Sequence, residues 1–93
     1  MSYKKGRSFE YRVRRYYEKQ GYLVIRSAGS KGIADLVAIK GDEVLLIQCK
    51  IRKYLNKWEK EQVKYWKPRV NAKFVLAWRK GKRKLVIEEI RVV

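Results

Sequence analysis

The sequence contains no histidine, a single cysteine, a single proline and only nine acidic residues among its 93 positions. The absence of histidine excludes histidine general bases, histidine-ligated zinc sites and hydrolases built around a catalytic histidine. Cys49 has no second cysteine with which to form an internal disulfide, which fits a reducing, intracellular setting. Any catalysis by this chain must therefore use carboxylates, lysine, hydroxyl groups and a hard metal ion.

The chain also lacks a long hydrophobic segment. No apolar run approaches the roughly 20 residues of a membrane-spanning helix, and no signal-peptide pattern opens the chain, so we expect no membrane partner. The 25 Lys and Arg residues against nine Asp and Glu residues give a formal net charge of +16. This excess favours a nucleic-acid partner through counterion release, and a solvated basic surface of a thermophilic protein is the alternative.

Apolar periodicity and turn residues indicate a single domain over residues 1–93. Phe9, Val13 and Tyr17 recur at helical spacing, and Gly21 follows them as a stop. The patterns predict helices at residues 6–20 and 58–67 and strands at residues 22–28, 33–40, 43–51, 73–79 and 84–93. This order, αβββαββ, favours an α+β fold in which a central mixed β-sheet carries a helix on each face.

Two neighbouring apolar strands carry polar residues that packing does not explain. Asp35 lies within residues 33–40, and Gln48 and Lys50 lie near the end of residues 43–51. Because side chains alternate along a strand, Gln48 and Lys50 face the same way, and a short turn lets the two strands pair. Asp35 can then lie beside both residues. Carboxylate and amide oxygens suit Mg²⁺, and a lysine beside the metal can orient or deprotonate the attacking water.

Glu10 is the third candidate, because it stands beside the apolar stripe of the first helix and can reach over the sheet toward the metal. Each candidate also has an ordinary explanation when it is taken alone. Glu10 could be a helix acid paired with Arg14 four residues later. Asp35 could be a turn or strand-edge acid, and Lys50 a solvated charge at a strand end. Only the joint pattern favours a site that cleaves phosphodiesters.

A wider set of residues has the order and spacing of a known family: Lys5-Gly6, Glu10, Gly21-Tyr22, Arg26, Ser30, Asp35, Gln48-Cys49-Lys50 and Gln62. Through them the chain resembles the PD-(D/E)xK nuclease superfamily and, within it, the archaeal-type Holliday junction resolvases. The resemblance implies a restriction-endonuclease-like core and a homodimer that binds four-way DNA junctions and cuts two opposed strands. It implies Mg²⁺ as the cofactor, with Mn²⁺ as a substitute, and an intracellular protein of archaeal or viral source.

The resemblance also implies roles for individual residues. The metal ligands would be Glu10, Asp35, Gln48 and the backbone carbonyl of Cys49. Lys50 would be the catalytic lysine. Ser30 would match a loop serine near the scissile phosphate, and an ordinary loop hydroxyl is the equal alternative.

Two positions depart from the family pattern. Ala34 replaces a proline, which has no chemical cost. Gln48 replaces the usual glutamate, so a carbonyl ligand is kept but one negative charge is removed. A Q-x-K form is compatible with activity, while weaker metal binding or a protein that only binds DNA becomes an alternative.

The remaining predictions concern basic and aromatic residues. Basic residues expected to contact DNA phosphates are Lys4, Lys5, Arg7, Arg14, Arg26, Lys31, Arg52 and Lys53. Trp58, Tyr65, Trp66 and Trp78 favour core or dimer packing over base stacking. Cys49 faces away from Gln48 and is expected in the core.

Three functions compete on this sequence. The first is a metal-dependent endonuclease that resolves four-way junctions. The second is a nuclease of the same fold that acts on other branched, nicked or duplex DNA. The third is a non-catalytic basic protein that binds DNA or RNA, and the acids beside Lys50 argue against it because they would repel phosphate.

Overall fold

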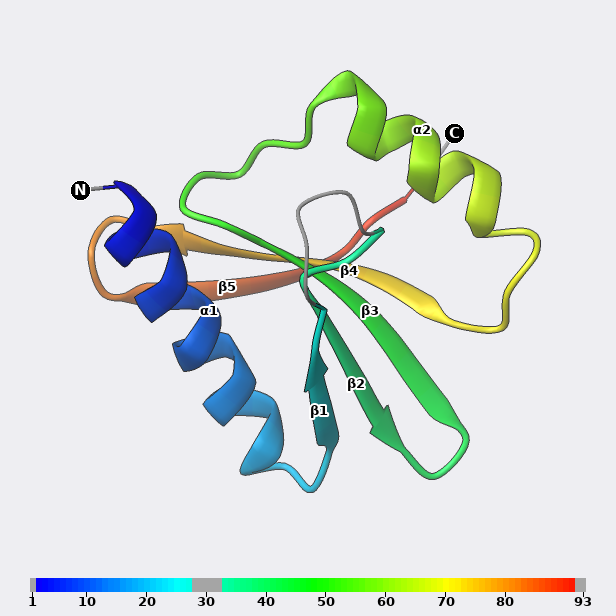
Figure 1. The fold of residues 1–93 in the computed structure, drawn as a ribbon, viewed down its shortest axis with the longest axis horizontal. Helices are drawn as coiled ribbons and strands as arrows, with labels where there is room; N and C mark the ends of the chain where they lie inside the picture. Colours follow the sequence, from blue (N-terminus) through cyan, green and yellow to red (C-terminus); the bar gives the residue numbers. More distant parts are fainter. Residues whose placement is uncertain (1, 28–32, 92–93) are drawn as a thin grey trace.

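A mixed sheet and two helices make up the fold in a computed structural model, which describes the backbone of residues 2–27 and 33–91 and the side chains of residues 7–27 and 33–91 (Figure 1). The elements are α1 (Ser2–Glu18), β1 (Leu23–Arg26), β2 (Leu36–Lys40), β3 (Glu43–Lys50), α2 (Lys57–Trp66), β4 (Lys73–Lys80) and β5 (Lys84–Glu89). Their order is the αβββαββ order that the sequence predicts. Neither helix of the described chain is long and apolar enough to cross a membrane.

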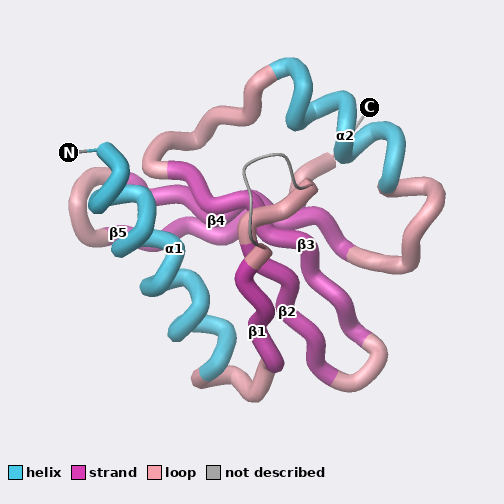
Figure 2. The backbone as a smooth tube through the Cα atoms, in the orientation of Figure 1, coloured by secondary structure: helices cyan, strands magenta, loops and turns pink. Residues whose placement is uncertain are grey.

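The strands lie in the sheet in the order in which they occur in the chain, β1-β2-β3-β4-β5. β3 and β4 pair in parallel, whereas the other neighbours pair antiparallel, so the sheet is mixed as predicted. Gly41 and Gly81 adopt φ angles of 59° and 69° in the tight turns before β3 and β5, a region that glycine enters without strain. The parallel pair requires a long crossover, which contains α2 (Figure 2).

α1 covers one face of the sheet with a single apolar stripe. Phe9, Val13 and Tyr17 are buried at helical spacing. They share a core cluster with strand residues Val24, Leu36, Ala38, Leu45, Ile47, Val75 and Ala77. Cys49 packs against this cluster, as its position opposite Gln48 predicts. Burial of each large aliphatic side chain contributes about 1.5–3 kcal/mol, so this face fixes α1 against β1, β2 and β3.

α2 lies on the opposite face of the sheet. Phe74 and Leu76 alternate along β4 with the core residues that face α1, and both are buried. Val63 of α2 is 1% exposed. The helix begins with a capping box at Asn56 and ends shortly before Pro68, which cannot continue it. A helix on each face therefore agrees with the prediction.

Several predicted boundaries differ from the structure. α1 begins at Ser2 rather than residue 6, because a single glycine costs a helix only about 1 kcal/mol. β2 begins at Leu36, so the expectation that Asp35 lies inside this strand is wrong. There the Asp35 side chain accepts from the Cys49 amide of β3, and the Gln48 side chain donates to the Ile33 carbonyl ahead of β2. β1 and β5 are shorter than predicted, and residues 28–32, 92 and 93 lie outside the described chain.

The exposure of the aromatic residues on α2 contradicts the alternative that they pack in the core. Trp58, Tyr65 and Trp66 are 47%, 52% and 37% exposed, so the core alternative is wrong for these three, and dimer packing stays a prediction. The buried side of this helix carries Glu59 and Val63 instead, which leaves the aromatic rings on its other sides. Trp78 on β4 is half-buried, and its indole Nε1 donates to Glu88.

Candidate active site

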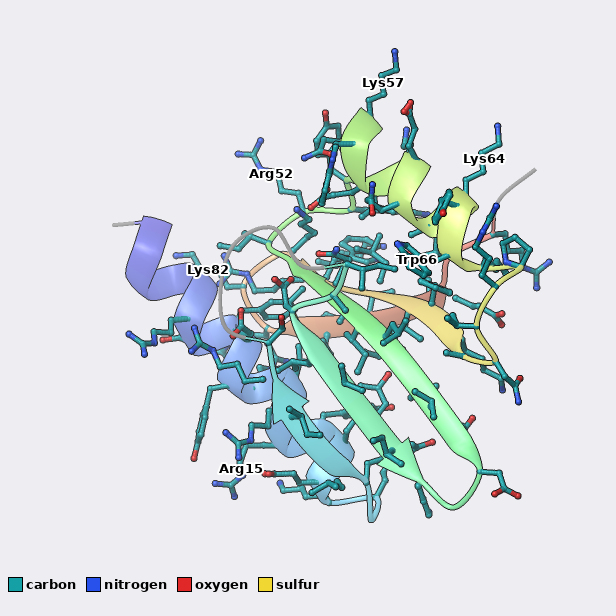
Figure 3. The ribbon with its side chains drawn as sticks, turned by 45° about the vertical axis from the view of Figure 1, so that its right-hand side comes forward. Arg15, Arg52, Lys57, Lys64, Trp66 and Lys82 are labelled. Atoms are coloured by element: carbon teal, nitrogen blue, oxygen red, sulfur yellow. The ribbon has the colours of Figure 1, made fainter. Side chains whose placement is uncertain are left out.

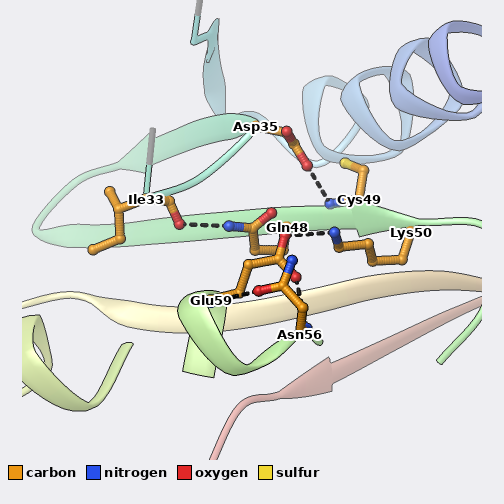
Figure 4. Close-up of polar contacts among 7 residues, drawn as sticks. All are labelled: Ile33, Asp35, Gln48, Cys49, Lys50, Asn56 and Glu59. Carbon is orange, nitrogen blue, oxygen red and sulfur yellow. Dashed lines mark hydrogen bonds and ion pairs between the residues drawn. The ribbon is translucent and has the colours of Figure 1, made fainter. Parts of the chain in front are cut away.

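The β2–β3 hairpin brings Asp35, Gln48 and Lys50 to one end of the sheet (Figure 4). Leu36 pairs with Ile47, and the Asp35 amide donates to the Ile47 carbonyl over 2.8 Å, so Asp35 lies beside Gln48. The Asp35 Oδ2 accepts a 2.8 Å hydrogen bond from the Cys49 amide. This bond uses one carboxylate oxygen and leaves Oδ1 for another partner.

Gln48 is held in a defined orientation inside the protein. Its side chain is 5% exposed, and its Nε2 donates to the Ile33 carbonyl over 2.8 Å. Because the amide nitrogen is directed at Ile33, the other end of the amide, Oε1, remains as an oxygen acceptor. A neutral carbonyl ligand, as predicted from the sequence, is compatible with this orientation.

Lys50 contacts an acid that the sequence reasoning missed. Its Nζ lies 2.5 Å from Glu59 Oε2, and Glu59 comes from the first turn of α2 (Figure 4). The other carboxylate oxygen, Oε1, accepts a 2.9 Å hydrogen bond from the Asn56 amide, while the Glu59 amide donates to Asn56 Oδ1 over 2.8 Å. The spacing of Asn56 and Glu59 is a capping-box pattern and could have located this acid.

Glu10 forms an ion pair with a residue of β1. Arg26 Nε lies 2.6 Å from Glu10 Oε1, so the alternative pairing with Arg14 is wrong. Arg14 instead bonds Glu18 over 3.1 Å. Glu10 and Arg26 line a hollow of about 200 Å³ together with Arg7, Tyr11, Arg14 and Leu36.

The pKa of Asp35 shows which neighbouring groups interact with its carboxylate. Partial burial is the main cause that raises the pKa of Asp35 above its ordinary value. The Cys49 amide and the Lys50 ammonium oppose this rise in the pKa. The negative charges of Glu10 and Glu59 add to it. Both of these acids therefore act on Asp35, although they come from helices on opposite faces of the sheet.

The donor set can be compared with the needs of a metal ion. No group of three or more histidine, cysteine, aspartate or glutamate side chains that could hold a metal is found in the described part of the chain. The available donors are oxygens, the type that Mg²⁺ prefers, and a cation would compensate the desolvated charge of Asp35. Before Glu10 could bind a metal ion, it would have to leave its ion pair with Arg26. The donors thus fit a hard cation held partly by neutral oxygens.

Predicted DNA-contacting residues lie on both sides of the site. Arg7, Arg14 and Arg26 surround the hollow beside Glu10. Arg52 and Lys53 follow β3 and are exposed, and Arg52 points away from the fold with Lys57 and Lys64 of α2 (Figure 3). Lys53 pairs with Glu88 over 3.2 Å. The side chains of Lys4 and Lys5, and all of Ser30 and Lys31, lie outside the described residues.

Comparisons with known proteins agree with one another. A sequence model of the family described as archaeal Holliday junction resolvase (Hjc) matches residues 1–92. Crossover junction endodeoxyribonuclease Hjc of Methanocaldococcus jannaschii is 48% identical over 65 residues, which covers 66% of this chain and 48% of the relative. The chain thus spans about half the length of that relative. The solved structure of Archaeoglobus fulgidus Hjc, a Holliday junction resolvase, matches with a TM-score of 0.76 and 27% identity over 90% of this chain and 76% of that chain.

Proposed function

The chain belongs to the family of archaeal Holliday junction resolvases (Hjc), and on that basis we propose that it is a metal-dependent DNA endonuclease acting on four-way junctions. The reaction is hydrolysis of a phosphodiester bond. The observation that carries the proposal is the convergence of Asp35, Gln48 and Lys50 at one end of the β2–β3 hairpin. A partly buried acid beside phosphate would weaken simple DNA binding, because like charges repel.

The metal would be held by Asp35, Gln48, Glu10 and the backbone carbonyl of Cys49. Mg²⁺ is the proposed ion, and Mn²⁺ would substitute for it, since both accept oxygen ligands. When bound, the ion would supply Lewis-acid stabilisation of the phosphate and a more acidic water molecule. Asp35 and Gln48 are oriented for this task by their bonds to Cys49 and Ile33.

Lys50 would act on the chemical step. Its ammonium would orient the attacking water and offset the negative charge that develops on the phosphate. Its charge is one of 25 on the chain, so its contribution to overall DNA affinity would be small. Ser30, five residues before Asp35 in the sequence, would contact the scissile phosphate.

The DNA would cross the exposed basic side chains on both sides of the site. Arg7, Arg14 and Arg26 would bind phosphates on the α1 side, and Arg52 and Lys53 on the side that leads to α2. Lys4, Lys5 and Lys31 would extend these two groups. This division into two groups is supported by the hollow beside Glu10 and by the exposure of the segment after β3.

We propose that two copies of this single domain form a symmetric homodimer. A four-way junction has two opposed strands to cut, and a two-fold axis would present one site to each. The exposed Trp58, Tyr65 and Trp66 supply apolar area suited to a partner surface. Light scattering at micromolar concentration should give about twice the 11.2 kDa of one chain, and a mass of one chain would reject the dimer. The DNA substrate would place the protein inside the cell.

A binding protein without catalysis is the second candidate, and Gln48 is the observation that favours it. With glutamine there, the site has one negative charge fewer than the family pattern, and the described residues contain no preformed group of three acidic ligands. Cleavage on duplex, nicked or otherwise branched DNA would require the same residues and differs only in substrate.

One experiment separates these functions. The protein is incubated with labelled four-way junction, nicked duplex, duplex and single-stranded DNA, with Mg²⁺, with Mn²⁺ and with EDTA. We expect paired cuts in the junction that depend on the metal. Tight junction binding with no cleavage under any condition would reject the enzyme in favour of the binding protein.

A further inference from the structure

The ion pair between Lys50 and Glu59 joins the proposed catalytic lysine to α2. Lys50 is the last residue of β3, and its side chain is 28% exposed. Gln48, two residues earlier on the same face of the strand, carries no charge. The ammonium directly contacts the carboxylate of Glu59, at 2.5 Å.

The Glu59 carboxylate is fixed from its own side. Its side chain is only 11% exposed, and a charge so buried is retained in a fold when it is paired and hydrogen-bonded. Oε1 receives the Asn56 amide of the capping box, which sets the carboxylate on the first turn of α2. Oε2 is thereby directed at Lys50.

The cap alone does not account for the contact with Lys50. A glutamine serves in a capping box as well as a glutamate, because only one side-chain oxygen is required. A partly exposed lysine at a strand end also needs no acid for folding, because water can solvate its ammonium. Neither the capping box nor the folding of Lys50 requires a negative charge at residue 59. The contact between the second oxygen of Glu59 and Lys50 therefore has a role other than stabilising α2.

We propose that Glu59 is a positioning residue that holds the Lys50 ammonium in place for cleavage of the phosphodiester. The inference rests on the proposed nuclease function. Lysine has a long side chain with many rotamers, and restraint of its head group removes the motion that would take it from the phosphate. The crossover helix in this way becomes part of the active site.

The test compares Glu59→Gln with Glu61→Gln, an exposed acid on the same helix that serves as the control. Single-turnover cleavage is measured with the protein in excess over the junction and at saturating Mg²⁺, and junction affinity is measured with Ca²⁺ in place of Mg²⁺. Misplacement of a catalytic group by about 1 Å can cost on the order of 10²-fold. We expect Glu59→Gln to cut about 10- to 100-fold more slowly, with affinity and melting temperature close to those of the control.

A double-mutant cycle shows whether Glu59 acts through Lys50. In a Lys50→Met background, Glu59→Gln should cause no further loss of cleavage, because the group that it holds is already absent. An equal loss in both backgrounds would mean that the substitution acts through the fold, and it would overturn the inference. So would a Glu59→Gln rate equal to that of Glu61→Gln.

A measurement that does not depend on cleavage completes the test. An ion-paired ammonium gives a protected NMR signal, which Lys50→Met assigns and which Glu59→Gln should remove. Persistence of the signal in Glu59→Gln would overturn the inference. A wild type that cuts no substrate rejects the proposed function and this role with it, whereas an active wild type with an unaffected Glu59→Gln rejects only the role of Glu59.

Discussion

The carboxylate of Asp35 accepts a hydrogen bond from the backbone amide of Cys49 at 2.8 Å. The bond ties the residue that precedes β2 to the end of β3, next to Gln48 and Lys50. It also stabilises the charged form of a carboxylate whose pKa is raised mainly by burial. The Cys49 amide thus favours the charge of Asp35 in a setting that otherwise disfavours it.

Replacement of Asp35 by asparagine should abolish cleavage while junction binding largely survives. Asparagine retains an oxygen that can accept the Cys49 amide, so the hairpin geometry is kept, but the charge that holds a cation is lost. Cleavage assays and gel-shift titrations measure the two effects. Asp42→Asn, in the exposed turn before β3, is the control. Full activity of Asp35→Asn, or of the wild type in excess EDTA, would reject the metal site.

The same substitution should stabilise the metal-free fold as the pH rises. The folded-state pKa of Asp35 is raised above its ordinary value, so the folded chain holds the proton more tightly than the unfolded chain. Its contribution to stability is full below the ordinary pKa and is lost as the pH rises through the raised pKa. The melting temperature of Asp35→Asn minus that of wild type, both in EDTA, should increase from about pH 4 to about pH 7. A decrease would contradict the direction of the shift.

Lys50→Ala should lose most of the cleavage rate and little of the junction affinity. Removal of a group that assists proton transfer or charge stabilisation costs on the order of 10²-fold or more. The overall basic charge, which dominates affinity, would hardly change. Lys82→Ala, in the exposed turn between β4 and β5, removes the same charge from a residue outside the proposed site (Figure 3). If single-turnover rates of the two variants fell equally, Lys50 would be an ordinary surface charge.

Gln48→Glu should lower the Mg²⁺ concentration that cleavage requires, and Gln48→Ala should raise it. The glutamate adds a charged ligand, yet it loses the amide that donates to Ile33. Loss of this bond leaves the partly buried Ile33 carbonyl unsatisfied, which costs about 1–3 kcal/mol, so Gln48→Glu should melt below wild type in EDTA and recover with Mg²⁺.

Mg²⁺ titrations of cleavage and melting curves measure these effects for both Gln48 variants. Gln20→Glu, in the exposed turn after α1, is the control for added negative charge. A silent wild type rescued by Gln48→Glu would identify a nuclease whose activity has lapsed. Silence of all three proteins, with tight junction binding, would leave only the binding protein.

Junction binding should depend steeply on salt. If a basic face neutralises roughly 6–10 phosphates, affinity should fall by about 10³-fold or more between roughly 50 and 200 mM salt. A fluorescence anisotropy titration series measures the slope, and uncharged sucrose at matched osmolarity is the control. A nearly flat dependence would contradict a phosphate-dominated interface.

The hairpin that carries the candidate site was predictable, because the sequence features that form it are local. Alternation places Gln48 and Lys50 on one face of β3, and Gly41 sets the turn that pairs β3 with β2. The exact start of β2 was not predictable, because side-chain bonds from Asp35 and Gln48 are mixed with backbone bonds at this end. The backbone propensities of these residues do not indicate where a side chain takes part in pairing the strands.

The contacts of the helices were harder to predict. Glu59 resembles any acid on a helix that also carries Lys57, Lys60 and Lys64, and its contact with Lys50 depends on how the crossover folds back. The ion pair of Glu10 was hard to predict for the same reason. Arg14 is close to Glu10 in the sequence, but Arg26 is its partner in the folded protein. Periodicity gives the side of a helix that a charge occupies, but it does not give the residue that meets the charge.

The sequential order of the strands has a consequence for how this chain folds. β1, β2 and β3 pair with their chain neighbours, so the hairpin with Asp35 and Gln48 can close through a short loop. β4 can join β3 only after the whole crossover has returned, and long loop closure is slow. We therefore expect the acid and amide end of the sheet to assemble early in folding and the Lys50–Glu59 contact to form with the last strand pairing. Native-state hydrogen exchange would then find the hairpin more protected than α2.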